Sequence, residues 1–253
     1  MSFNLISPRD KPEFSHASQS ATRGTLRISE TFTSRQGEGL LTGTDSYFVR
    51  TSGCNLRCWF CDTPYASWKP SGPQVPVESI VDAVIESGLK HAVVTGGEPM
   101  LPATSIDLCE LLRAAGIHVT IETAGTVDRD IPCDLMSISP KLACSTPDAD
   151  QHPSWNRLHE QRRMPIEIMK RLIKDAPEFQ IKFVVDSPAD YTEVNEIVTQ
   201  LDVDTDHIWI MPQGSTIEAL DQSITWLKPW AESAGYRYCE RMQIRWFGNR
   251  RGT

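Results

Sequence analysis

Residues 46–63 read SYFVRTSGCNLRCWFCDT and contain three of the seven cysteines of the chain. Its first six residues form a β-prone run that predicts a short strand. The strand leads directly into Cys54, Cys58 and Cys61, which have the spacing C-x3-C-x2-C. Three thiolates at this spacing can ligate three irons of a 4Fe–4S cubane. The fourth iron is then open to a small molecule.

The other four cysteines offer no fourth ligand near this loop. Structural zinc normally uses four protein ligands, and simple ferredoxins use four cysteines for each cluster. An odd total of seven cysteines, three of them crowded together, favours metal binding in a reducing compartment over a disulfide framework. We expect the scattered thiols to behave as small buried hydrophobes; they are Cys109, Cys133, Cys144 and Cys239.

Downstream of the cysteines, strand-like and helix-like segments alternate, which implies parallel βαβ units. The predicted strands cover 46–51, 91–95, 118–122, 135–139, 179–185, 207–211 and 236–241. The predicted helices cover 77–87, 105–115, 165–174, 191–201 and 215–234. The fold class is α/β, and the pattern favours a partial or modified (β/α) barrel of mostly parallel strands, without settling whether the barrel closes. Function should gather where these strands end.

Composition narrows the class of protein. The chain has 253 residues, and 40% of them are hydrophobic, so it can bury a core without disulfides. A net charge of −8 disfavours nucleic acid as a partner. No apolar run approaches the ~20 residues that span a bilayer. Residues 1–23 lack the apolar core of a signal peptide, which suggests a cytoplasmic protein. We predict a flexible extension over 1–27 and one domain over 28–253.

Two motifs in order carry a family resemblance. Phe60 immediately precedes the third cysteine, and the turn Gly96-Gly97-Glu98-Pro99 follows the next predicted strand. Together with the cysteine spacing, they resemble the signature of the radical S-adenosylmethionine superfamily. The resemblance implies a barrel of the radical SAM type, a 4Fe–4S cluster, and S-adenosylmethionine bound at the open iron. A glycine such as Gly97 has no Cβ, which would let the backbone approach the methionyl amine closely.

A larger ordered set of motifs, spread over roughly residues 28 to 248, narrows the resemblance. The set comprises the turn 36–39 (QGEG), Arg50, CDT at 61–63, TGGEPM at 95–100, ET-x-G from Glu122 and Thr123, SPK at 139–141, and MPQ at 211–213. It resembles the 7-carboxy-7-deazaguanine synthase family. The resemblance implies a lyase that converts 6-carboxy-5,6,7,8-tetrahydropterin to 7-carboxy-7-deazaguanine with loss of ammonia, in queuosine or another deazapurine pathway.

The same resemblance supplies candidate site residues. Those implied to contact S-adenosylmethionine are Phe60, Cys61, Asp62, Gly97, Ser139, Pro140, Lys141, Met211, Pro212, Gln213 and Gly214. Those implied to contact the substrate are Arg35, Gln36, Gly37, Glu38, Arg50 and Thr95. The chemistry suits these roles, because a planar guanidinium binds a carboxylate well. Thr63 is implied to hold Mg²⁺, which prefers oxygen ligands. Lys182 has either a role in the site or a salt bridge at the barrel mouth.

Several alternatives stay open. A glycyl-radical activase would share the cysteine spacing and act on a protein, whereas an electron carrier would hold the cluster without producing deoxyadenosine. The resemblance also implies a reductase such as flavodoxin or ferredoxin as a partner, and a homodimer. The polar segment 143–164 is interpreted as an insertion or lid. The C-terminal stretch 243–249 does not follow the family pattern, and residues beyond Gly248 are interpreted as a tail.

Overall fold

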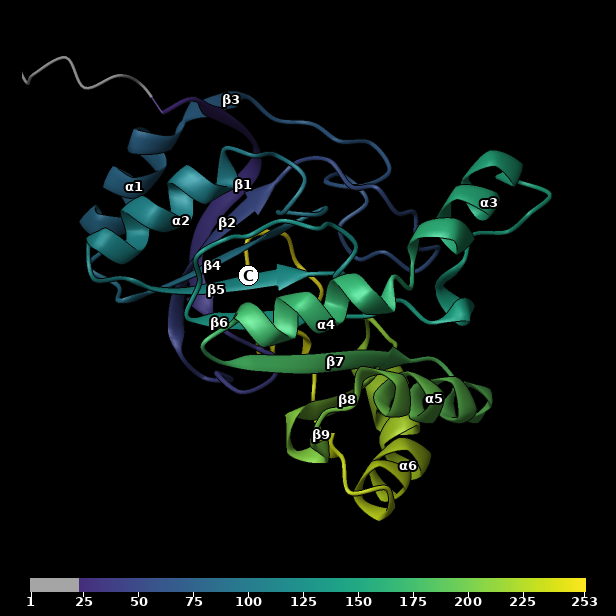
Figure 1. Cartoon of the computed structure of the whole chain (residues 1–253). Coiled ribbons are helices and arrows are strands. Elements are labelled where there is room, and N and C mark those ends of the chain that lie inside the picture. The colour runs from purple at the N-terminus through teal and green to yellow at the C-terminus, as the bar shows by residue number, and fades with distance from the viewer. Residues whose placement is uncertain (1–22) are drawn as a thin grey trace, which may run out of the picture.

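The computed structural model describes residues 23–253, and its centre is one curved, open sheet (Figure 1). Within this range the strands are β1 (Thr25–Arg35), β2 (Asp45–Thr51), β3 (Gln74–Pro76), β4 (His91–Gly96), β5 (His118–Thr123), β6 (Leu135–Ile138), β7 (Phe179–Val185), β8 (Ile208–Pro212) and β9 (Arg237–Tyr238). Their order is β3-β1-β2-β4-β5-β6-β7-β8-β9. β1 is antiparallel to both neighbours, and every pair from β2 to β9 is parallel. The predicted partial barrel of mostly parallel strands is confirmed, and it does not close.

Helices connect the strands and cover the outer face of the sheet. They are α1 (Val77–Glu86), α2 (Ser105–Ala114), α3 (Pro153–Arg162), α4 (Ile166–Asp175), α5 (Tyr191–Leu201), α6 (Ile217–Ser233) and α7 (Met242–Phe247). In Figure 1, α1 and α2 lie side by side at one end, while α4, α5 and α6 follow one another toward the other end. Each crossover returns the chain to the same edge, so the parallel strands all end on one side.

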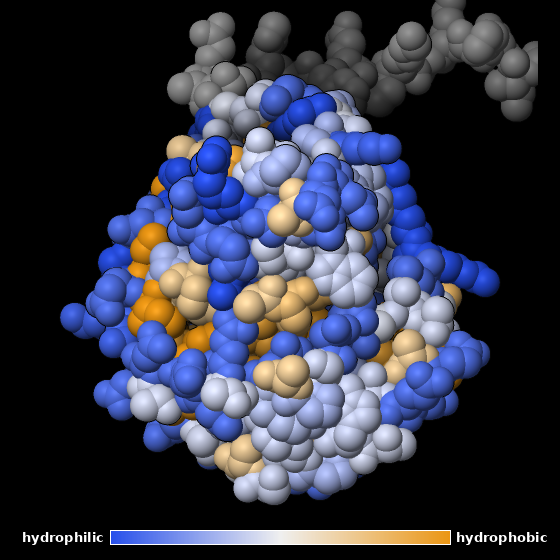
Figure 2. Space-filling view, turned by 90° about the vertical axis from the view of Figure 1, so that its right-hand side faces the viewer, coloured by the Kyte–Doolittle hydropathy of each residue, from blue (hydrophilic) through white to orange (hydrophobic). Residues whose placement is uncertain are grey.

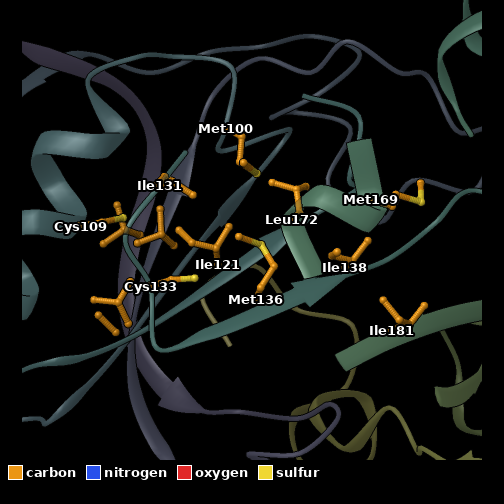
Figure 3. Close-up of a cluster of buried hydrophobic side chains, with 14 of the residues drawn as sticks. Met100, Cys109, Ile121, Ile131, Cys133, Met136, Ile138, Met169, Leu172 and Ile181 are labelled. Carbon is orange, nitrogen blue, oxygen red and sulfur yellow. The ribbon is translucent and has the colours of Figure 1, made fainter. Parts of the chain in front are cut away.

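The hydrophobic core lies between the sheet and these helices (Figure 3). Ile121, Met136 and Ile138 point from the middle strands toward Met169 and Leu172 of α4, and all five are buried. The predicted burial is confirmed for three of the scattered cysteines, and Cys144 is only partly buried; the three are Cys109, Cys133 and Cys239. All seven cysteines are free thiols. Among the described residues, no helix combines the length and apolar character needed to cross a membrane.

The N-terminal part of the fold differs from the sequence-based expectation. Residues 1–22 of the predicted extension lie outside the described residues, but β1 begins at Thr25 and Leu26 is buried in the core. The ordered domain therefore starts before residue 28. Because β1 precedes β2, the turn at 36–39 joins these two antiparallel strands. The predicted strand 236–241 is also shorter, since β9 covers only Arg237 and Tyr238.

Candidate active site

A cavity of about 530 Å³ lies at the carboxyl ends of the parallel strands. Figure 2 views the molecule from the side toward which β5 and β7 point, and hydrophobic residues gather in the hollowed middle of this face. The cavity is lined by every candidate site residue except three, which are Pro140, Pro212 and Gly214. Residues separated by more than 200 positions in sequence therefore meet in one place. The N-terminal turn at 36–39 and the C-terminal residues 248–253 face the same space.

The three clustered cysteines form one wall of this cavity. Burial raises the pKa of Cys54 to about 12 and that of Cys58 to about 11. Thiols with such values stay protonated unless a bound cation stabilises the thiolate, as iron does. Within residues 23–253, no group of three or more His, Cys, Asp or Glu side chains is arranged to hold a single metal ion. Thiolates that ligate different irons of a cluster stand farther apart than the ligands of one ion. Three thiols on one wall suit a cluster with one iron left open, whereas structural zinc normally uses four protein ligands.

Hydrogen bonds from several segments fix the cysteine loop. Arg57 donates from Nη1 to the carbonyl oxygens of Cys54 at 2.8 Å and Leu56 at 2.6 Å. The indole nitrogen of Trp68 donates to the carbonyl of Cys58 at 2.9 Å. With its backbone carbonyls engaged in this way, the loop presents its thiols from a defined position.

The segment 143–164, interpreted from sequence as an insertion or lid, packs against this loop. His159 of α3 is fully buried, and its Nδ1 accepts the backbone N–H of Arg57 at 3.2 Å. Its Nε2 lies 2.9 Å from the hydroxyl of Ser145. The backbone N–H of Trp59 donates to the carbonyl of Ser145 at 3.1 Å. These contacts make the segment a support for the cysteine loop.

The glycine turn after β4 meets the start of the cysteine loop. A Cβ on Gly97 would lie 2.1 Å from the carbonyl oxygen of Gly53, so only glycine fits there. The next residue, Glu98, is fully buried, and its carboxylate accepts Thr123 Oγ1 at 2.8 Å and the N–H of Ala124 at 2.9 Å. Burial raises the pKa of Glu98, although these hydrogen bonds act to lower it. The turn therefore joins the ends of β4 and β5 to the loop, in addition to any contact with a cofactor.

A buried polar network occupies the opposite side of the cavity. Lys182 Nζ lies 3.1 Å from Glu38 Oε2 and 3.0 Å from Glu122 Oε1. Gln36 joins both carboxylate-bearing segments, because its amide donates to Glu122 at 3.2 Å and accepts the N–H of Glu38 at 3.1 Å. Burial alone would raise the pKa of Glu38, but the charges of Lys182 and Arg241 lower it to about 2. Of the two alternatives for Lys182, the salt bridge is thus present, and it lies on the cavity wall.

Arg50 of β2 lines the cavity, and one nitrogen of its guanidinium is held by an ion pair. Its Nε lies 2.7 Å from Glu30 Oε1 on the neighbouring strand. The same carboxylate accepts the hydroxyl of Tyr65 at 2.8 Å, and Arg251 binds its other oxygen at 2.8 Å. Among the described residues, none accepts a hydrogen bond from the two terminal nitrogens of Arg50. The guanidinium is therefore fixed in position with its donor fork available to a ligand.

The remaining candidate residues differ in burial and in the partners of their side chains. Thr95 is buried at the end of β4, and Thr63 Oγ1 lies 3.7 Å from Cys61 Sγ. Lys141 donates to both the carbonyl and the hydroxyl of Ser139 at 2.7 Å, which fixes the SPK turn. Arg35 lines the cavity but is largely exposed, and its Nε pairs with the carboxylate of Asp45 at 3.3 Å.

Comparison with known proteins places the chain in a family. A model of the radical SAM superfamily matches residues 48–187. The 7-carboxy-7-deazaguanine synthase of Rhodopirellula baltica is 58% identical over 233 residues, which cover 92% of this chain and 91% of that protein. The enzyme of the same name from Halobacterium salinarum is 42% identical over 231 residues, or 87% of this chain and 89% of that one. The chain belongs to the 7-carboxy-7-deazaguanine synthase family.

Solved structures agree with this family at the level of the fold. The crystal structure of QueE from Escherichia coli matches with a TM-score of 0.63 and 22% sequence identity, covering 85% of this chain and 93% of that one. Membership in the radical SAM superfamily makes the chain an enzyme that uses a 4Fe–4S cluster and S-adenosylmethionine with an external reductant. The three cavity-lining cysteines fit the cluster, because they are the three thiols that one short loop brings to the cavity.

Sequence reasoning missed several residues of the cavity. Glu30, Tyr65, Arg241, Gln243 and Arg251 all contact candidate residues or line the cavity itself. None of these five residues carried a signal in the sequence, unlike Lys182, which is a cation within an apolar strand. Arg241 and Gln243 precede or open the short helix α7, and their partners lie some 200 positions earlier in the chain.

Proposed function

We propose that this chain converts 6-carboxy-5,6,7,8-tetrahydropterin to 7-carboxy-7-deazaguanine with loss of ammonia. The observation that carries the proposal is one cavity lined both by three cysteines and by a fixed set of polar groups suited to a carboxylated pterin. The names of the relatives that cover most of the chain support the same reaction. When bound, the cluster and S-adenosylmethionine supply the radical chemistry.

The chain's own residues would bind and orient the pterin. Arg50 presents two guanidinium nitrogens to the substrate carboxylate, while Glu30 holds its Nε from behind. Glu38, whose pKa is lowered to about 2, stays ionised and accepts N–H groups from the pterin ring. Gln36 and Thr95 supply further polar contacts on the cavity wall. A substrate enclosed among these groups is shielded from water, which protects reactive species from side reactions.

We also propose that Thr63 would hold a Mg²⁺ ion, which would supply positive charge for the substrate carboxylate. Thr63 lines the cavity next to Cys61. The neighbouring Asp62 is already paired with Arg241 at 2.5 Å, so the protein would offer few ligands. Mg²⁺ commonly keeps several waters and binds through few protein groups plus substrate, which suits this site. Thr63→Val should then weaken the dependence of pterin binding on added Mg²⁺.

Other components of the proposal concern partners and location. A flavodoxin or ferredoxin would deliver the single electron, and the seven free thiols fit the reducing interior of a cell. The family resemblance implies a homodimer, and an open groove lined by Arg35, Trp246 and Phe247 is a candidate contact surface. Light scattering of the purified protein tests the dimer.

The reaction is tested by anaerobic reconstitution, followed by incubation with the tetrahydropterin, S-adenosylmethionine and dithionite. Chromatography should detect the deazaguanine product. Arg50→Ala should lower kcat/KM for the pterin by about 100-fold, because a charged bidentate contact is lost. Arg113→Ala, which breaks the exposed pair with Asp134, is the matched control and should leave turnover unchanged. Absence of deoxyadenosine would indicate an electron carrier, and unchanged turnover in Arg50→Ala would remove the carboxylate assignment.

A further inference from the structure

One buried arginine connects three separate parts of the cavity. Arg241 is 9% exposed and immediately precedes α7. Its Nη2 lies 2.5 Å from Asp62 Oδ2, its Nη1 donates to the carbonyl of Gly214 at 2.6 Å, and its Nε lies 3.4 Å from Glu38 Oε1. Every nitrogen of the guanidinium is thus committed to a different segment of the chain.

These three partners belong to regions with different proposed ligands. Glu38 is part of the turn proposed to bind the pterin. Asp62 follows the third cysteine directly, and Gly214 ends the turn after β8 that is proposed to contact S-adenosylmethionine. Gly214 does not line the cavity, whereas Arg241 does, and Arg241 holds the Gly214 carbonyl. Arg241 pairs with Glu38 and Asp62, but the proposed reaction assigns no role to the link that it makes among the three segments.

We propose that Arg241 is a positioning residue that couples binding of the substrate to binding of S-adenosylmethionine. This inference rests on the proposed function, because it takes the pterin as the ligand of Glu38. When the pterin binds, it fixes the Glu38 carboxylate. That carboxylate fixes the guanidinium, which in turn holds Asp62 and the Gly214 carbonyl in place for the second ligand.

The physical basis is the rigidity of the guanidinium. Its nitrogens form a planar fork, so the three partners cannot move independently while the contacts persist. A ligand shifts an equilibrium only when it binds two states differently. In this proposal the two states differ in whether the guanidinium keeps all three contacts, and both ligands favour the state that keeps them. Ordering the fork with one ligand removes part of the entropy that the other ligand would lose. Coupling is reciprocal, so each ligand should tighten the other equally.

Direct contact between two ligands in one cavity could also couple their affinities. Such contact does not pass through Arg241 and would survive its replacement. Lys182 offers a second contrast, because it binds the same Glu38 carboxylate but touches neither Asp62 nor Gly214. Lys182→Met should therefore weaken pterin binding while leaving most of the coupling.

The experiment measures the Kd of S-adenosylmethionine by anaerobic titration of the reconstituted enzyme, with and without saturating pterin. In the wild type, pterin should lower this Kd by about tenfold, within the usual range of coupling. In Arg241→Gln the ratio should fall to about one, while each ligand alone still binds. Asp62→Asn, at a half-exposed side chain, should reduce the ratio even if Arg241→Gln fails to fold. Arg245→Gln, which removes pairs with Asp221 and Glu240 outside the cavity, should change neither Kd.

Hydrogen exchange provides a readout that does not need the cluster. Pterin added to cluster-free wild type should protect the amides of residues 54–66, and Arg241→Gln should abolish this protection. A tenfold ratio that persists in both Arg241→Gln and Asp62→Asn would overturn the proposal, as would a ratio of one in a wild type that binds both ligands. A wild type that binds S-adenosylmethionine but no pterin would instead refute the proposed function, and the coupling would fall with it.

Discussion

Single residues on the cavity wall have the sharpest consequences, beginning with the cysteines. Replacing Cys54, Cys58 or Cys61 with alanine should remove one iron ligand and prevent stable assembly of the cluster. Iron and sulfide analysis after anaerobic reconstitution should find about four irons per chain in the wild type and far fewer in each variant. Cys109→Ala is the matched control, because this thiol is buried in α2 away from the cavity, and it should keep the full iron content.

Substitutions at two glycines distinguish the effect of steric crowding from the effect of backbone strain. Gly97→Ala places a Cβ 2.1 Å from the carbonyl of Gly53, whereas Gly88→Ala meets open space but at a φ of +73°. Each substitution should lower the free energy of unfolding by about 1 to 3 kcal/mol. Only Gly97→Ala should also weaken S-adenosylmethionine binding, as measured by titration. Equal affinities in the two variants would contradict a cofactor role for the glycine turn.

A buried histidine makes stability depend on pH. Burial lowers the pKa of His91 from 6.5 to about 4, and its ring nitrogens contact Ser46 at 2.6 Å and Thr120 at 2.8 Å. The unfolded chain takes up a proton below pH 6.5 that the folded chain takes up only near pH 4. Stability from this group is therefore fully present above pH 6.5 and is lost as the pH falls to 4, by up to about 3 kcal/mol.

Denaturant unfolding across this pH range checks the expectation. His91→Gln should flatten the decline in the free energy of unfolding between pH 6.5 and 4. His152→Gln changes an exposed histidine and should leave the decline as it is in the wild type. A decline of the same slope in His91→Gln would show that other groups cause it.

At the scale of elements, α3 determines how firmly the cysteine loop is held. His159→Ala would remove the acceptor of the Arg57 N–H and leave that donor buried without a partner. The reconstituted variant should lose its cluster faster than the wild type when a chelator is added, as followed by visible absorbance. Arg157→Ala lies on the exposed face of the same helix and should lose the cluster at the wild-type rate. Equal rates for His159→Ala would show that α3 does not support the loop.

Elements with a strong hydrophobic period could be predicted from the sequence, and those without one could not. α1 and β4 appear within one residue of the predicted bounds, because their apolar residues follow helical or strand periodicity. β1 was missed, since most of its 11 residues are exposed or half-buried and polar. α3 has little apolar character to reveal it, and it is stabilised by the contacts that His159 makes at the cysteine loop.

At the scale of the whole molecule, the cavity depends on the most distant parts of the chain. Motifs predicted which strand ends would meet, because parallel strands end on one side. They could not predict Glu30, Arg241 or Arg251, since an ion pair across some 200 positions depends on the finished fold. The segment after Gly248, interpreted from sequence as a tail, lines the cavity, and Arg251 holds Glu30 behind Arg50.

Deleting residues 249–253 tests the importance of this segment. The truncated protein should keep its cluster and its affinity for S-adenosylmethionine, because the cysteine loop and the turns after β4 and β8 remain. Its KM for the pterin should rise by about tenfold, since Arg251 no longer restrains Glu30 beside Arg50. An unchanged KM, measured by product formation, would mean that the segment does not contribute to the substrate site.

A cavity lined by residues from both ends of the described chain also imposes an order on the protein's maturation. Cys61 leaves the ribosome long before Arg241 and Arg251, so the thiols are exposed on a nascent chain whose cavity still lacks one wall. We therefore expect iron and sulfide to reach the thiols during synthesis. The residues that enclose the cavity arrive only afterwards.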